Sequence, residues 1–268
     1  MLCGPFEARL RLDRLGGVGN TSPFTTQGES SMDLGQFYRE ENGLMYITPE
    51  QGSRFAKQVA GDFNPIHDPD GRRFCVPGDL LFALILDRFG LAQRMSCRFH
   101  SMVGRDTPLR FEQVESGPIK VMDAAGKVVL EATTDGGITH DKDAISDFTQ
   151  RYVSFSGLNF PHYLDPLMQE HNVMFNPERP LVIYDRMDFA TSELAVAGLD
   201  LELSGSNLEV DGKRAIARLK FSIRLSGREV GTGAKKLLIS GLRPYDPDVM
   251  ASLTEEFYRR KNAFESAS

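Results

Sequence analysis

One segment of this sequence is apolar on every side. Residues 80–86 are an unbroken run of Leu, Phe, Ala and Ile that follows Pro77-Gly78-Asp79 and gives way to charged residues before Gly90. A helix made of such a run has no polar face to turn toward water, so other parts of the protein must enclose it. The run is far shorter than the roughly 20 residues that span a bilayer. We predict a buried helix here and no membrane span.

Strand-like segments follow this helix along the chain. They are short, rich in β-branched or aromatic side chains, and lie at residues 109–114, 119–122 and 128–133. The turn residues Asp123-Ala124-Ala125-Gly126 separate the last two. One buried helix followed by antiparallel strands is typical of a sheet that wraps around a central helix, so we predict the α+β class.

The second half of the chain repeats this order of elements. Helices are expected at residues 163–171 and 181–194, and alternating strands at 199–210, 214–225 and 229–239. The pairs Asp211-Gly212 and Ser226-Gly227 between these strands are hairpin turns. The repetition favours two similar halves, 32–150 and 151–268, that pair as two subunits would. The alternative is a single unit with a long C-terminal extension.

The first 31 residues differ from the rest. Residues 20–31 are rich in Ser, Thr, Gly and Gln, and burial of their few apolar side chains cannot offset the entropy of ordering them. We therefore expect a disordered tail over residues 1–31, with ordered sequence starting at Met32. The tail lacks the apolar stretch of a secretory signal. Translation from upstream of the natural start and a cleaved or regulatory arm both remain open.

Composition sets the class of partner. The chain has 268 residues, a net charge of −6 and three widely spaced cysteines, Cys3, Cys75 and Cys97. The negative charge disfavours a nucleic-acid partner, and the cysteine spacing fits neither a zinc site nor a disulfide framework. We expect a cytoplasmic protein whose partners are small molecules or other proteins, and a homodimer is possible.

Residues 59–70 contain the candidate chemistry. A capping box at Thr48-Pro49 predicts a helix that ends at Gly61, so Asp62 and His67 follow on a turn. A proline-containing turn can bring these two side chains toward one another. A carboxylate and an imidazole facing one small volume can take a proton from water and deliver one elsewhere. The alternative is a structural turn in which Asp62 and His67 only form local hydrogen bonds.

These residues carry a family resemblance. Gly61-Asp62 and Asn64-Pro65-Ile66-His67 match the Gly-Asp-x-Asn-Pro-x-His motif of the MaoC-like and (R)-specific enoyl-CoA hydratases of the hot-dog superfamily. The resemblance covers about residues 45–112 and implies a hot-dog fold. Together with the repeated order of elements, this predicts a double hot dog in one chain. The resemblance also implies that Asp62 and His67 are the catalytic pair, with Asn64 in support, and that no metal or cofactor takes part.

The same resemblance implies that the backbone N–H of Gly78, at the start of the buried helix, holds the thioester carbonyl oxygen. Three features depart from the hydratases: the stretch from His67 to Gly78 is shorter, Pro77 stands where a His is common, and Asp79 adds a negative charge beside Gly78. From Met32 onward the chain also resembles an uncharacterised proteobacterial family of unknown function.

The resemblance implies a hydratase or dehydratase that acts on a 2-enoyl or 3-hydroxyacyl thioester of coenzyme A or acyl carrier protein. Two other functions remain open at this point. The chain is a thioesterase if water attacks the carbonyl carbon instead, because the same fold can hold a thioester for that reaction. It is a non-catalytic acyl-thioester-binding or regulatory protein if the turn is kept without a working pocket.

Overall fold

The computed structural model describes residues 32–267, so the tail expected over residues 1–31 lies outside the described part. The helices are α1 (Pro49–Phe55), α2 (Gly78–Phe89), α3 (Lys142–Gly157), α4 (Leu164–Glu170) and α5 (Pro247–Ala267), with short 3₁₀ or π segments η1 (Leu34–Phe37), η2 (Ala56–Ala60), η3 (Pro65–His67) and η4 (Asn159–Tyr163). The strands are β1 (Arg39–Glu41), β2 (Leu44–Tyr46), β3 (Leu91–Phe99), β4 (Leu109–Gln113), β5 (Ile119–Asp123), β6 (Val128–Thr139), β7 (Val173–Met174), β8 (Val182–Thr191), β9 (Leu199–Asp211), β10 (Arg214–Leu225), β11 (Arg228–Ser240) and β12 (Arg243–Pro244).

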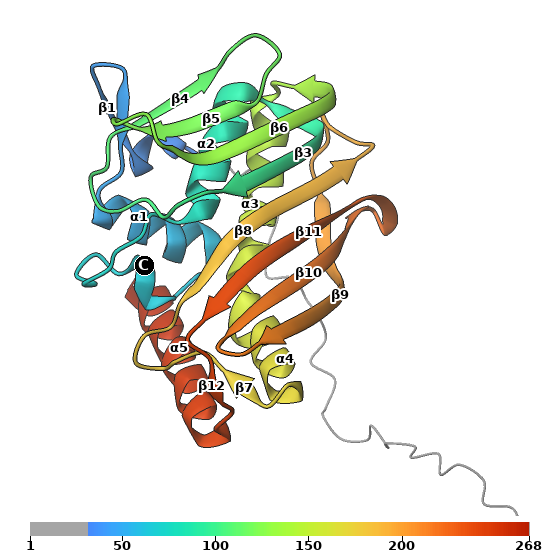
Figure 1. Ribbon diagram of the computed structural model, residues 1–268. Coiled ribbons are helices and arrows are strands. Elements are labelled where there is room, and N and C mark those ends of the chain that lie inside the picture. The colour runs from blue at the N-terminus through green and yellow to red at the C-terminus, as the bar shows by residue number, and fades with distance from the viewer. Residues whose placement is uncertain (1–31, 268) are drawn as a thin grey trace, which may run out of the picture. The chain divides into compact units, whose positions relative to one another are not determined.

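Ten of these strands form one antiparallel sheet in the order β1-β2-β4-β5-β6-β3-β8-β11-β10-β9. Its first six strands come from the first half of the chain and its last four from the second half (Figure 1). The halves meet where β3 pairs with β8, with Met95 opposite Phe189. Strands β7 and β12 form a separate pair next to α5.

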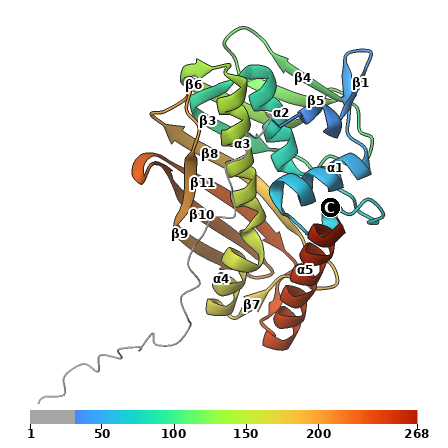
Figure 2. The same ribbon diagram turned by 180° about the vertical axis from the view of Figure 1, so that it is seen from behind.

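Helices α2 and α3 lie side by side on one face of this sheet, which curves around them (Figure 2). The α2 side chains from Leu80 to Leu86 are all buried, as their sequence demands. Across the two helices, the rings of Phe82 and Tyr152 lie 4.7 Å apart between centroids. A sheet wrapped around a central helix is the hot-dog fold, and a helix followed by strands occurs twice. The predicted α+β class and hot-dog fold are confirmed.

The second central helix is not where the sequence analysis placed it. Residues 181–194, expected as a helix, form β8 instead. This stretch opens with Val182-Ile183-Tyr184, residue types that favour strands, and β3 and β11 satisfy its backbone groups from both sides. The central helix of this half is α3, which was missed, and the boundary expected between residues 150 and 151 falls inside it. Strand β3 was also missed.

The buried helix α2 ends just before Gly90. Gly90 takes φ +88°, which residues with a Cβ avoid, and its N–H donates to Leu86 O. A Cβ at this position would lie 2.7 Å from Ile138 Cγ2 and from Thr139 O. The chain therefore turns directly from α2 into β3.

None of the helices within residues 32–267 is long and apolar enough to cross a membrane.

Replacing Leu84 by Ala should lower the free energy of unfolding by about 3 kcal/mol, because a fully buried leucine leaves a cavity in a packed core. The measurement is denaturant unfolding followed by circular dichroism. The matched control is Leu203→Ala on β9, where the side chain is 37% exposed and the expected loss is small. Equal losses for the two variants would contradict the central placement of α2.

Candidate active site

The motif turn is fixed by hydrogen bonds within a few residues. The capping box at Thr48 starts α1, and the segment ends at Gly61 in the left-handed conformation, φ +66°. Asp62 Oδ1 then accepts from the N–H of Asn64 at 2.8 Å, and Asn64 Oδ1 accepts from the N–H of Ile66 at 3.1 Å. Because these are local bonds, the turn follows directly from the sequence.

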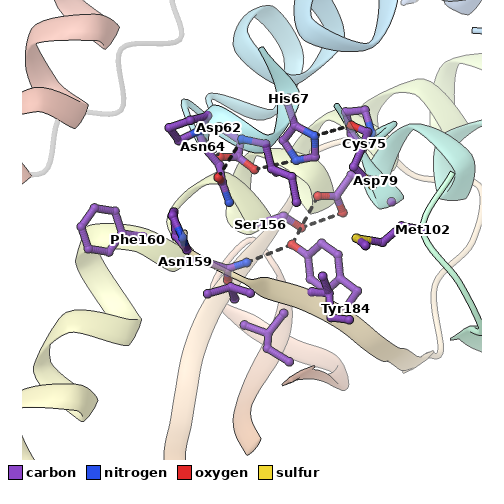
Figure 3. A pocket seen from close by; sticks show the side chains of 18 of the residues that line it. Asp62, Asn64, His67, Cys75, Asp79, Met102, Ser156, Asn159, Phe160 and Tyr184 are labelled. Carbon is purple, nitrogen blue, oxygen red and sulfur yellow. Dashed lines mark hydrogen bonds and ion pairs between the residues drawn. The ribbon is translucent and has the colours of Figure 1, made fainter. Parts of the chain in front are cut away.

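The turn brings the predicted pair together (Figure 3). Asp62 Oδ2 lies 3.5 Å from His67 Nε2. On the other side of the ring, His67 Nδ1 lies 2.7 Å from the carbonyl oxygen of Cys75. A carbonyl oxygen can only accept, so Nδ1 carries a hydrogen and donates it. The Nε2 atom is therefore the position where His67 gains or loses a proton beside Asp62.

The surroundings of His67 favour its protonated form. Burial acts to lower the His67 pKa, but the hydrogen bond and negative charge of Asp62, with the carbonyl of Cys75, act in the opposite direction. The pKa of His67 is raised above its ordinary value of 6.5. A histidine in this state can both hold and release a proton near neutral pH.

The short connection from His67 to Gly78 places the start of α2 beside this pair. The N–H of Cys75 donates to Ile66 O, and the N–H of Val76 donates to Val103 O, both at 2.9 Å. A Cβ at Gly78 would lie 2.9 Å from Phe99 Cε1 and 3.2 Å from Tyr184 Cδ2, so glycine suits this close approach. The helix has no side-chain cap. The N–H of Leu80 donates to Pro77 O at 3.1 Å, so the N–H groups of Gly78 and Asp79 are the ones available to an acceptor.

Asp62, Asn64, His67 and Gly78 all line one cavity of about 610 Å³. The second half of the chain and α5 contribute four charged side chains to this cavity, Glu178, Asp185, Glu256 and Arg260. They also contribute apolar side chains: Phe160, Leu164, Phe175, Val182, Leu237, Leu253 and Phe257. His100, which lacks any metal-binding spacing in the sequence, also lines it. Within residues 32–267 no group of three or more His, Cys, Asp or Glu side chains is placed to hold a metal ion.

Asp79, directly after Gly78, is another carboxylate that lines this cavity, and it is buried. Its Oδ1 accepts from the Ser156 hydroxyl at 2.9 Å and its Oδ2 accepts from the Tyr184 hydroxyl at 3.3 Å. Lys235, also buried, donates to Ser156 Oγ and to the carbonyl oxygen of Tyr152. Burial raises the Asp79 pKa while the charge of Lys235 opposes this. Burial also disfavours the charged form of Lys235 and lowers its pKa to about 8, while the negative charge of Asp79 acts to raise that pKa.

Sequence reasoning singled out Asp79 but missed its partners. Ser156 and Tyr184 lie far away in the chain, and Tyr184 falls in the stretch expected as a helix. The sequence pattern around Lys235 could have identified it as a buried lysine. It shares the inward face of a predicted strand with Leu237 and Ile239, and a lysine at such a position requires a buried partner.

Two other elements hold the motif turn from outside. The guanidinium of Arg260 on α5 donates to Phe63 O at 2.9 Å and to the Asp68 carboxylate at 2.6 Å. The rings of Phe63 and Phe257 meet edge to face at 5.8 Å. From the other side, α3 approaches so closely that a Cβ at Gly157 would lie 1.8 Å from Ala60 O.

Gly157→Ala should therefore disturb both the turn and the fold, with an expected loss of about 3 kcal/mol in the free energy of unfolding, at the upper end for overpacking. Denaturant unfolding measures this loss. Gly205→Ala is the matched control, because no atom lies within 4 Å of a Cβ there. A Gly157→Ala protein as stable as the control would show that α3 does not abut the turn.

The His67 pKa should fall when Asp62 is replaced by Asn, since the variant loses the negative charge that favours the imidazolium. NMR titration of the imidazole measures this shift, and Asp70→Asn, an exposed carboxylate in the same loop, should leave the pKa unchanged. A pKa raised in the folded state stabilises the protein below pH 6.5, and this contribution disappears as the pH rises through the folded pKa. An unaltered His67 pKa in Asp62→Asn would refute the pairing.

Fold and site together define a hot-dog protein with a carboxylate–histidine pair in a cavity at the start of its central helix. The chain belongs to the family described as Protein of unknown function (DUF3581), whose model matches residues 32–248. The comparison with curated proteins found no match.

Among solved structures, the chain is similar to a putative MaoC domain protein dehydratase from Chloroflexus aurantiacus J-10-fl, with 9% identity, 84% of this chain and 99% of that chain covered, and a TM-score of 0.40. It is also similar to acyl-CoA thioesterase II TesB2 from Mycobacterium marinum, with 13% identity, 79% and 98% covered, and a TM-score of 0.38.

Proposed function

We propose that this protein hydrates the double bond of a 2-enoyl thioester, or catalyses the reverse dehydration of a 3-hydroxyacyl thioester. The observation that carries the proposal is the 3.5 Å approach of Asp62 Oδ2 to His67 Nε2 in the wall of a cavity that also holds the start of α2. Two titratable groups and an uncapped helix start are the parts that this reaction needs.

In this reaction one water molecule lies between Asp62 and His67. The pair removes a proton from the water as its oxygen bonds to C3 of the enoyl group, and the pair then returns a proton to C2. Between these steps negative charge develops on the thioester oxygen. The N–H of Gly78 and the positive end of the α2 dipole stabilise this charge, because the helix supplies no competing cap.

The role of Asn64 is to shape the turn. Its side-chain oxygen is occupied by the N–H of Ile66, so it orients the segment that carries His67. The apolar side chains in the cavity lining suit the acyl chain of such a thioester, because burial of a hydrocarbon chain against them is favourable. The carrier that we propose is coenzyme A or acyl carrier protein.

Thioester hydrolysis is the second candidate, and one observation favours it. Asp79 follows Gly78 directly and lines the same cavity, so a carboxylate lies close to the place proposed for the thioester carbonyl. A carboxylate there can activate water for attack on the carbonyl carbon, with the thiol as leaving group. The two reactions differ in product, because only hydrolysis releases free thiol.

The experiment incubates the purified protein with a panel of enoyl-CoA thioesters and follows loss of the conjugated double bond and release of thiol in parallel. Asp62→Asn and His67→Gln should each lower the hydration kcat by about 100-fold or more, as expected when a general acid or base is removed. Because the two residues act on one water, the double variant should be scarcely worse than either single one.

Asp70→Asn and His171→Gln serve as matched controls, since both residues are exposed, and both should keep the wild-type rate. Loss of the double bond without thiol release supports hydration. Thiol release that survives Asp62→Asn and His67→Gln supports hydrolysis at Asp79 instead. Thioester binding without either product would replace the enzyme proposal by a binding function.

A further inference from the structure

The negative charge of Asp79 at the start of α2 would oppose the binding of another negative charge there. An aspartate in the first turn of a helix commonly binds the free N–H groups there, and its charge repels any other anion. In this protein the Asp79 side chain makes no such cap. Both of its oxygens are instead turned to donors on other elements, Ser156 on α3 and Tyr184 on β8.

A buried cation, the Lys235 ammonium, donates to one of these donors, Ser156. Lys235 on β11 is 0% exposed and reaches Ser156 Oγ, which in turn donates to Asp79. Its ammonium lies 4.2 Å from the ring centroid of Tyr152 and 4.9 Å from that of Phe155. Aromatic faces attract cations but cannot neutralise them. An isolated buried charge is costly, so Lys235 requires an anion, and Asp79 is the carboxylate whose charge acts on it.

We propose that Lys235 is a positioning residue for the reaction: through Ser156 it neutralises Asp79 and holds that carboxylate away from the start of α2, leaving those N–H groups to the thioester oxygen. This inference rests on the proposed function, because it concerns the charge that develops on that oxygen. Lys235 acts through Asp79 and touches no reacting atom.

Four other titratable groups surround Asp79. Asp62 and His67 on the motif turn, Tyr152 on α3 and Tyr184 on β8 all act on it electrostatically or share its interactions. Asp62 carries the same sign as Asp79 and is paired with His67. Lys235 is thus the cation that balances Asp79, as His67 balances Asp62.

The inference predicts a particular pH dependence for Lys235→Met. Without the ammonium, Asp79 is neutral at low pH, and when it ionises at higher pH its charge opposes the developing anion. The kcat for hydration should therefore fall as pH rises from 6 to 8, on the order of 10-fold more than in the wild type, whose Lys235 keeps its ammonium below its pKa of about 8. KM should change little, because the opposing charge matters only in the transition state.

Asp79→Asn added to Lys235→Met should restore the wild-type pH profile, because it removes the uncompensated carboxylate. This double variant also removes both members of the buried pair, so it should fold even where Lys235→Met does not. Ser156→Ala breaks the bridge while keeping both charges and should shift the profile in the same direction. Lys220→Met, an exposed lysine on β10, is the matched control and should follow the wild type.

A Lys235→Met profile parallel to the wild type, or a loss that Asp79→Asn does not rescue, would overturn the inference and leave the proposed hydration intact. A second measurement separates failure of the function itself. The carboxyl carbon of Asp79, followed by ¹³C NMR, should titrate at higher pH in Lys235→Met than in the wild type whether or not the protein hydrates enoyl thioesters. An unchanged carboxyl pKa would overturn the inference even in an inactive protein.

Discussion

The enclosure of α2 is the constraint on which the rest of this structure depends. A helix with no polar face must be covered all round, and here the sheet covers it from one side and α3 from another. Burying the helix also buries its first turn. An enclosed helix start with no side-chain cap is a place of positive potential inside the protein, and the motif turn ends beside it.

Both halves of the chain contribute to this place. The motif turn and α2 belong to the first half, while Ser156, Tyr184 and Lys235 come from α3 and the strands of the second. Gly157 lets α3 touch the residue before the motif turn, so the packing of the halves and the geometry of the pair are linked. The site is therefore built from both halves of the chain, and the first half alone would lack the partners of Asp79.

Asp62 and Asp79, two of the carboxylates that line the cavity, have different environments. Asp62 is 31% exposed at its side chain and faces His67, whereas Asp79 is buried and held by hydroxyl groups with Lys235 behind them. Two nearby carboxylates with different partners can take different roles in proton transfer, because their surroundings separate their protonation behaviour. In the proposed reaction Asp62 works on the water, and Asp79 must be kept from interfering with the oxygen.

The sequence by itself determined what local interactions decide. The capping box at Thr48, the turn from Gly61 to His67 and the burial of residues 80–86 follow from hydrogen bonds and periodicity within a few residues. Residues 181–194 were misread because pairing with β3 and β11, both distant in sequence, decides their conformation. The sequence marks Asp79 and a lysine on an inward strand face, but it does not show that they share one network with Ser156 and Tyr184. Only tertiary packing brings two strands and a second helix to one carboxylate.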